Sequence, residues 1–187
     1  MKKNSAYNIL NIVTVIAVTM FFSCTNNFKE VQKVGVSENE PVGLAENINF
    51  KYTDSGKIKA ILVSSKMLDY TNRDFPFREF PDGATMDVFD NKNNKSVVVA
   101  DYAIIYEATG LIDLQGNVVI TTHDGNVLKT EQLYFDKTNE WLFSNEPVEI
   151  ASNDGTLMKG NVFDANDDFT SINIYEMYDS SMVLEED

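Results

Sequence analysis

The fold is decided by residues 116–135, GNVVITTHDGNVLKTEQLYF, because this stretch recurs in altered form as residues 146–165, EPVEIASNDGTLMKGNVFDA. The two copies superpose at a shift of 30 residues, and the same shift backward aligns residues 98–105 with the first copy. A looser copy lies at residues 63–70. Each unit has the pattern of a strand pair, which cannot bury its apolar face alone. The repeat therefore predicts stacked units that share one interior.

Turn sequences separate the apolar runs throughout the chain beyond residue 47. These clusters are short, polar and rich in Gly, Asn and Asp, which favours hairpins between antiparallel strands. No window has the apolar spacing of an amphipathic helix of ordinary length. The sequence predicts an all-β fold with turns at Asp54–Lys57, Asp90–Lys95, Ala108–Gly110, Asp124–Asn126, Asp136–Asn139 and Asn153–Gly155.

Superposing the copies assigns a face to each residue, because side chains alternate along a strand. The outward positions are polar or prolyl: Asn117, Lys129, Pro147, Glu149 and Lys159. The inward phase shifts by one residue after Ala100, Thr130 and Gly160, which predicts a β-bulge in each unit.

The N-terminal segment has the pattern of an export signal. Two lysines precede a mostly apolar run from Ile9 to Phe22, shorter than the ~20 residues of a membrane-spanning helix. The run ends at Cys24, which resembles the lipidated cysteine of bacterial lipoproteins, although Phe21 replaces the usual Leu. An uncleaved signal anchor is the alternative. We expect a signal over 1–23, a flexible tether over 24–46, a β-domain over 47–178 and an acidic tail over 179–187.

The composition excludes several classes of function. The chain has 15 Lys and Arg against 29 Asp and Glu, a net charge of −14, which disfavours nucleic-acid binding. A single Cys cannot form an internal disulfide framework, and the single histidine, His123, lacks further His or Cys ligands for zinc. In the acidic run Asp164–Asp168, Phe169 stands where a calcium loop needs Gly. We therefore predict no metal site, no cofactor and no catalytic residues.

Six segments of the chain, taken in their order along the sequence, resemble the LptC family of lipopolysaccharide-export components. The resemblance covers roughly residues 50–174 and implies an OstA-like β-jellyroll, in which twisted antiparallel sheets form an open V. Many family members have a membrane-spanning anchor, whereas this chain has the lipoprotein-like Cys24. The matching segments are Tyr52–Lys57, Val88–Asp90, Val99–Ala103, Leu114–Val118, Leu128–Glu131 and Gly155–Asn161.

The resemblance implies a transport scaffold rather than an enzyme. Such a protein would sit in the periplasm, held at the inner membrane by its N-terminus. It would receive lipopolysaccharide from an inner-membrane ABC transporter and pass it to an LptA-like bridge protein. The acyl chains would lie inside the V, against apolar side chains. The candidate groove residues are Phe77, Phe80, Val88, Val98, Ala103, Ile105, Val118, Ile120, Leu128, Leu133, Phe135, Val148, Ile150, Met158 and Phe163.

The open edges of the sheets are the expected docking surfaces, because a free strand edge can add a partner strand. We place them in the first strands, Ile48 to Val63, and in the last, Phe169 to Tyr178. The candidate interface residues are Ile58, Ile61, Gly155, Gly160, Ile172 and Ile174.

Two alternatives remain open at this stage. The inward apolar set could be an ordinary core, and Phe77 and Phe80 could either gate a groove or cap that core. The chain could also be a lipoprotein binding module of a glycan-uptake or surface-assembly system, which would require an exposed aromatic platform.

Overall fold

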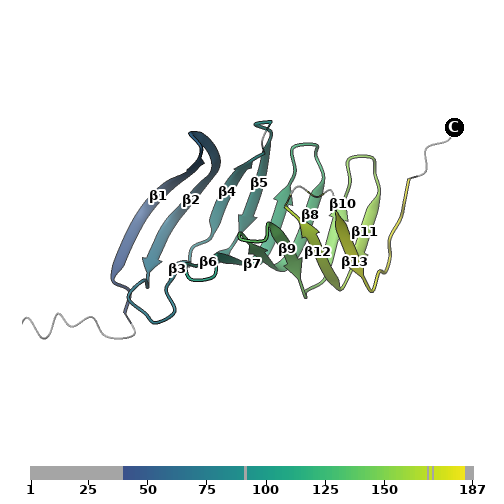
Figure 1. The fold of residues 1–187 in the computed structure, drawn as a ribbon. Helices are drawn as coiled ribbons and strands as arrows, with labels where there is room; N and C mark the ends of the chain where they lie inside the picture. The colour runs from purple at the N-terminus through teal and green to yellow at the C-terminus, as the bar shows by residue number, and fades with distance from the viewer. Residues whose placement is uncertain (1–39, 91, 168, 170, 184–187) are drawn as a thin grey trace, which may run out of the picture. The chain divides into compact units, whose positions relative to one another are not determined.

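The computed structural model describes residues 40–90, 92–167, 169 and 171–183, and within these ranges the chain is built from β-strands (Figure 1). All the strand pairings are antiparallel, which confirms the predicted all-β class. The strands are β1 Gly43–Asp54, β2 Lys57–Asp69, β3 Phe77–Phe80, β4 Ala84–Phe89, β5 Lys95–Ala100, β6 Tyr102–Tyr106, β7 Leu111–Thr121, β8 Val127–Asp136, β9 Trp141–Ser144, β10 Val148–Ala151, β11 Leu157–Gly160, β12 Val162–Asn166 and β13 Ile172–Tyr175.

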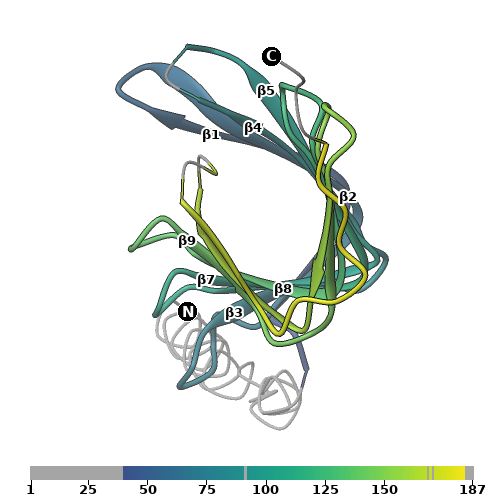
Figure 2. The ribbon, with the colours of Figure 1, turned by 90° about the vertical axis from the view of Figure 1, so that its right-hand side faces the viewer.

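Within residues 40–183 the sheet folds along a corner into two walls that form an open V (Figure 2). The first wall contains β4, β5, β10 and β11, and the second contains β3, β6, β9, β12 and β13. The long strands β1, β2, β7 and β8 run through the corner and belong to both walls. For example, β7 pairs with β5 through Val119–Thr121 and with β6 through Ile112–Gln115.

The predicted change of phase falls at this corner. In β7, Gly116 and Asn117 both have positive φ (73° and 46°) and together oppose Glu131, which is a β-bulge. Elsewhere the strand breaks instead: β5 ends at Ala100 before β6, and β11 ends at Gly160 before β12. The sequence thus predicted where the phase changes after Ala100, Thr130 and Gly160, but not how: the bulge next to Thr130 lies on the partner strand β7, and the other two sites are strand breaks.

Buried hydroxyl groups satisfy the backbone where the sheet bends. The Ser144 hydroxyl donates to the Gln132 carbonyl (2.7 Å) and accepts from the Glu146 amide (3.0 Å). In the N-terminal half of the domain, the Ser64 hydroxyl donates to the carbonyl of Gly83, in the connection between β3 and β4 (2.6 Å). Because an unpaired buried backbone group is costly, these side chains stabilise the bends by pairing backbone groups that the sheet leaves unpaired there.

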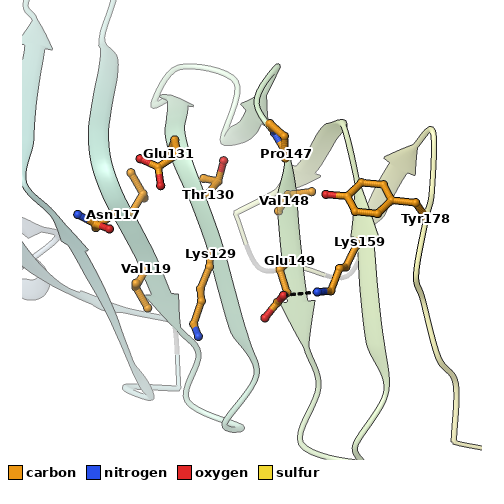
Figure 3. Close-up of a pocket in the computed structure, with 11 residues that line it drawn as sticks. Asn117, Val119, Lys129, Thr130, Glu131, Pro147, Val148, Glu149, Lys159 and Tyr178 are labelled. Atoms are coloured by element: carbon orange, nitrogen blue, oxygen red, sulfur yellow. Dashed lines mark ion pairs between the residues drawn. The ribbon is translucent and has the colours of Figure 1, made fainter.

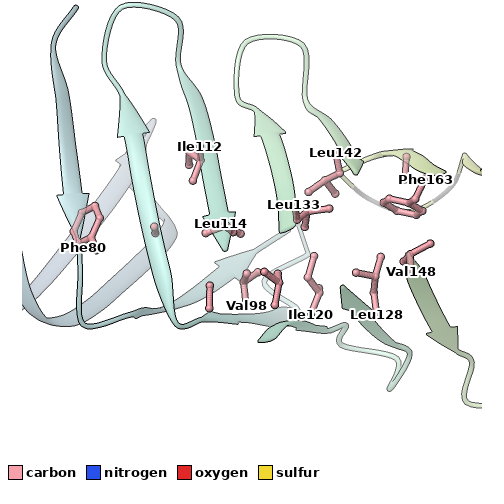
Figure 4. Packing of buried hydrophobic residues seen from close by; sticks show 14 of the residues in the cluster. Phe80, Val98, Ile112, Leu114, Ile120, Leu128, Leu133, Leu142, Val148 and Phe163 are labelled. Atoms are coloured by element: carbon pink, nitrogen blue, oxygen red, sulfur yellow. The ribbon is translucent and has the colours of Figure 1, made fainter. Parts of the chain in front are cut away.

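The core lines the inside of this corner (Figure 4). Val118, Leu133 and Phe163 are fully buried, and Phe80 and Val148 are 1% exposed. These residues come from both walls and from strands far apart in the chain. The predicted shared interior of the repeats is therefore present, with its tightest packing along the corner line.

The ends of the β-domain differ from the sequence-based expectation. β1 begins at Gly43, inside the expected tether, where Gly43 pairs with Asp69. Residues 179–183, expected to belong to a tail, include Ser181, which bridges to Leu157 of β11. In β1 the partly buried positions of this part, Gly43 and Ala45, are small, and residues 179–183 are exposed, so neither segment shows an alternation of large buried residues. The expected signal, Cys24, residues 24–39 of the tether and residues 184–187 lie outside the described residues.

Candidate functional site

An unbroken apolar row crosses the inner face of the first wall. Residues paired directly across an antiparallel sheet lie on the same face, so the strand register defines the row. It begins on the edge strand β1 and ends on β11 at the opposite end. Its members are Phe50, Leu62, Met86, Val98, Ile120, Leu128, Ile150 and Met158.

The second wall presents a matching apolar row. Ile105 pairs with Ile112, Ile112 with Phe135, and Phe135 with Leu142. The row continues through Ala165 to Ile172 on the edge strand β13. Two hydrocarbon surfaces therefore face each other across the V.

Exposure of this apolar interior is highest at the edge strands and near the strand ends, whereas the central members of the first row, such as Ile120 and Leu128, are 3% exposed. The corner side chains are sealed from solvent, whereas Phe50 is 46% exposed and its inward neighbour Tyr52 is 48% exposed. Val88, which shares the row of Tyr52 through Ala60, is 37% exposed, as is Ile172 on the second wall. Large apolar side chains thus remain in contact with solvent on the concave side, which makes this side a candidate binding surface. We call the inner faces of the two walls the groove.

An open hollow of about 360 Å³ lies at the C-terminal end of the groove. Met158, the last member of the apolar row, lines this hollow together with Ile174 and Met177. Methionine side chains are flexible and polarisable, and they adapt to ligands of irregular shape. The remaining lining residues are Ile172, Asn173 and Tyr175.

The outer face of the first wall has a different chemistry (Figure 3). A shallow hollow of about 380 Å³ lies there, lined by Lys129, Glu149, Lys159 and Tyr178 among others. Lys159 Nζ lies 2.8 Å from Glu149 Oε2, and this hydrogen-bonded ion pair lowers the pKa of Glu149 and raises the pKa of Lys159. The predicted outward positions Lys129, Glu149 and Lys159 are therefore outward, and their charged side chains share this surface with Val119 and Pro147.

The outer face of the second wall carries a buried carboxylate among aromatic rings. Asp113 is 5% exposed and accepts hydrogen bonds from the amides of Gln115 and Gln132, both 2.8 Å long. Burial, and then the negative charge of Asp113, raises the pKa of Tyr134, whose ring stacks on Phe143. Both carboxylate oxygens of Asp113 already accept a hydrogen bond from a glutamine side chain. We therefore infer that this network stabilises the fold.

Fourteen of the fifteen predicted groove residues lie on the inner faces of the walls. They share the inward phase of the pairing rows, and most are buried; Val88 is the most exposed. The fourteen are Phe80, Val88, Val98, Ala103, Ile105, Val118, Ile120, Leu128, Leu133, Phe135, Val148, Ile150, Met158 and Phe163.

Phe77 is the exception, and its assignment to the groove is wrong. It lies three residues before Phe80 on β3, so the two side chains point to opposite faces. Phe77 stacks on Tyr70, with ring centroids 4.7 Å apart, and pairs with Tyr106 on the outer face. It can neither gate the groove nor cap the core from inside, whereas Phe80 is core.

The structure places some of the expected interface residues at a sheet edge or in an exposed turn, and others inside the sheet. Ile61 lies on β2, which pairs with both β1 and β4, so it is not at a sheet edge. Gly160 is buried, because Ile174 and Tyr175 lie directly against it; its place on a docking surface is corrected. Ile172 and Ile174 do lie on β13, which pairs only with β12 among the described strands. Ile58 is exposed beside the β1–β2 turn, and Gly155 has the positive φ (91°) of a turn.

The sequence reasoning missed the groove residues of β1. Ile48, Phe50 and Tyr52 alternate with polar residues, which is the pattern of a strand with one apolar face. That signal was available, but it was assigned to a docking edge. Tyr52 also contacts the turn after β8, since Lys137 Nζ lies 4.1 Å from the centroid of its ring.

Comparison with known proteins adds one match. The family model described as LptC, "Lipopolysaccharide-assembly, LptC-related", matches residues 12–179 of this chain. No curated protein matches it. Within the described ranges, no helix has the length and apolarity needed to cross a membrane.

Proposed function

This chain belongs to the LptC family and is thereby involved in lipopolysaccharide transport, and from this premise we propose that its groove carries the acyl chains of lipopolysaccharide. The protein would accept the lipid from an inner-membrane ABC transporter and release it to a periplasmic β-jellyroll. On this proposal it binds and relays its ligand without chemical change.

The observation that supports this proposal is the graded exposure of the inner apolar rows. Each methylene transferred from water to an apolar surface gains ~0.8 kcal/mol, so a row that spans the sheet offers favourable contact along the whole path. Phe50, Tyr52 and Val88 are open to solvent on the concave side, where a chain can enter. The sealed corner below them keeps the two walls together.

The charge of the protein is consistent with entry by the acyl chains first. The whole chain has a net charge of −14, and beyond the Debye length of ~8 Å it repels an anionic headgroup only weakly. Close contact with phosphates would be less favourable than contact with hydrocarbon. We therefore place the sugars and phosphates outside the V, in solvent, and the acyl chains between the walls.

The tether and the neighbours complete the proposal. Cys24, lipidated or next to an uncleaved signal anchor, would hold the protein at the periplasmic side of the inner membrane. The edge strand β1 and the C-terminal strands β11 and β13 lie at the two ends of the sheet, where other β-proteins could add. We assign the first to the transporter side and the second to the bridge side.

Photo-crosslinking in cells tests the ligand and its location. A photoreactive amino acid at Phe50 or Val88 should form an adduct with lipopolysaccharide. The matched controls are Lys51 and Asp87, the next residues on the same strands, which point to the outer face. Adducts at the inner positions alone support the proposal, and adducts at neither or at both sets equally would refute it.

A further inference from the structure

The free edge of β11 is occupied by a segment of the same chain. We call residues 176–183 the strap. The Ser181 amide donates to the Leu157 carbonyl and the Leu157 amide donates to the Ser181 carbonyl, both at 2.8 Å. The Tyr178 amide donates to the Lys159 carbonyl at 3.1 Å, and the Lys159 amide donates to the Ser180 hydroxyl at 3.0 Å. The strap thus uses the backbone groups that an added strand would need.

The strap makes these bonds without being a regular strand. Glu176 and Asp179 have positive φ values of 51° and 43°, a region that is unfavourable for residues other than glycine. One of the four bonds uses a side-chain hydroxyl in place of a carbonyl. The side chains of Met177, Met182 and Val183 are more than half exposed, so little apolar burial holds the segment down.

The neighbouring edge at this end of the domain is open. β11 ends the first wall and β13 ends the second, and among the described residues β13 has a strand partner on one side only. A partner that continues both walls of the V must pair with both edges. The strap covers one of these edges, so it competes directly with such a partner.

We propose that the strap is a displaceable cap on β11, and that the edge strand of the next β-jellyroll replaces it when the two proteins dock. This inference rests on the proposed function, which supplies the β-jellyroll partner. The incoming strand would place an apolar residue beside Met158, inside the groove, and a polar residue beside Lys159, outside. In the free protein the cap prevents this edge from pairing with other chains.

The docking site would then be competent only while the strap is open. Apparent affinity falls in proportion to the competent fraction, so a cap closed for about nine-tenths of the time weakens binding about tenfold. Fixing the strap in place should abolish the remaining binding at β11, and removing it should restore the full affinity.

A reversible disulfide tests the cap in the full chain. The double variant Leu157→Cys, Ser181→Cys places two cysteines at a directly paired position, and Leu157→Cys alone is the control. The binding partner is the purified periplasmic β-jellyroll bridge protein of the same bacterium. We expect the oxidised double variant to bind at least about tenfold more weakly than the reduced one, with no such change in the control. Truncation after Glu176 should strengthen binding about tenfold.

The outcomes separate the cap from the function. Equal affinity of the oxidised, reduced and truncated proteins would overturn the cap while leaving the lipid adducts of the groove untouched. If no form binds the bridge protein, both the cap and the docking step of the proposed function fail. Hydrogen exchange of the Ser181→Pro variant is a second test. If the strap opens without unfolding of the wall, the amides of Leu157 and Lys159 exchange faster than in the parent protein, and the amide of Ile150 exchanges at the same rate.

Discussion

Replacing Gly160 with alanine should destabilise the β-domain by overpacking. A Cβ atom at this position would overlap the Ile174 Cγ2 atom and would lie 2.6 Å from the Tyr175 carbonyl oxygen. Ordinary contact needs 3.4 Å or more, so β13 must move away from β11 by nearly 1 Å. The carbonyl cannot rotate aside freely, because it accepts a hydrogen bond from the Asn161 amide (3.1 Å). The φ of Gly160 is not in the left-handed region, so the cost is steric alone.

Overpacking of this kind costs about 1–3 kcal/mol, and contact with fixed backbone places Gly160→Ala near the upper end. For a domain of this size, about 2–3 kcal/mol corresponds to a loss of roughly 6–12 °C in Tm. Urea unfolding followed by circular dichroism measures the change, with an unaltered m-value showing that the unfolded state is the same. Gly43→Ala is the matched control, since its Cβ would meet only Asp69 Cβ at 3.4 Å. The control should stay within about 0.5 kcal/mol of the parent protein.

The double variant Gly160→Ala, Ile174→Ala separates the two causes of destabilisation, which are contact with the Ile174 side chain and contact with the Tyr175 carbonyl. Removing the isoleucine relieves the first overlap and leaves the carbonyl contact, so part of the destabilisation by Gly160→Ala should disappear in the cycle. If Gly160→Ala alone unfolds within about 0.5 kcal/mol of the parent protein, the close approach of β13 to β11 is wrong, and the corrected role of Gly160 falls with it.

Three further predictions concern the core, the groove and a turn. Phe163→Ala should cost about 3–5 kcal/mol in urea unfolding because the ring is fully buried, whereas Val99→Ala on the outer face should cost less than about 1 kcal/mol; similar losses for the two would contradict the assignment of faces. Val88→Asp should remove the lipopolysaccharide adduct formed by a photoreactive residue at Phe50, with Asp87→Asn as the outer-face control; a persisting adduct argues against the groove path. The pKa of Asp136 is lowered first by the Asn139 side chain, so Asn139→Ala should move that pKa up toward 3.8 in a carboxyl NMR titration. Because the folded pKa is depressed, the stabilisation by Asp136 is present above pH ~4 and is lost as the pH falls through the folded pKa, and the Thr138 amide should exchange faster there.

The repeat carried most of what the sequence could predict. Ile120 and Ile150 are equivalent across the 30-residue shift, as are Leu128 and Met158, and the structure pairs the four side by side in one row. A strand that is buried on one face has apolar and polar residues in alternation. The sequence therefore shows both the strand period and the register that places the apolar residues on the buried face. The bends were equally visible, because Thr130 and Leu133 cannot both point inward along a regular strand.

Features that do not depend on alternation could not be predicted in this way. The strap is held by backbone hydrogen bonds and positive φ values, neither of which leaves a pattern of apolar residues. Similarly, no pattern in the sequence indicates that Tyr175 lies against Gly160. Phe77 was misplaced for a different reason: a cluster of aromatic residues was treated as one group, although a spacing of three residues on a strand separates two faces.

The corner of the V is built differently at its two ends, and this sets where the protein can give way. At the N-terminal end and in the middle, β1, β2, β7 and β8 run through the corner as continuous strands of 10 to 13 residues. Beyond them, the walls consist of separate strands of four or five residues, joined at Asn161 by one residue. Spreading the walls must bend a paired strand at the first end, but only a short connection at the second. We therefore expect the two walls to move apart more easily at the C-terminal end than at the N-terminal end. A bulky ligand between the walls should widen the V at the C-terminal end first.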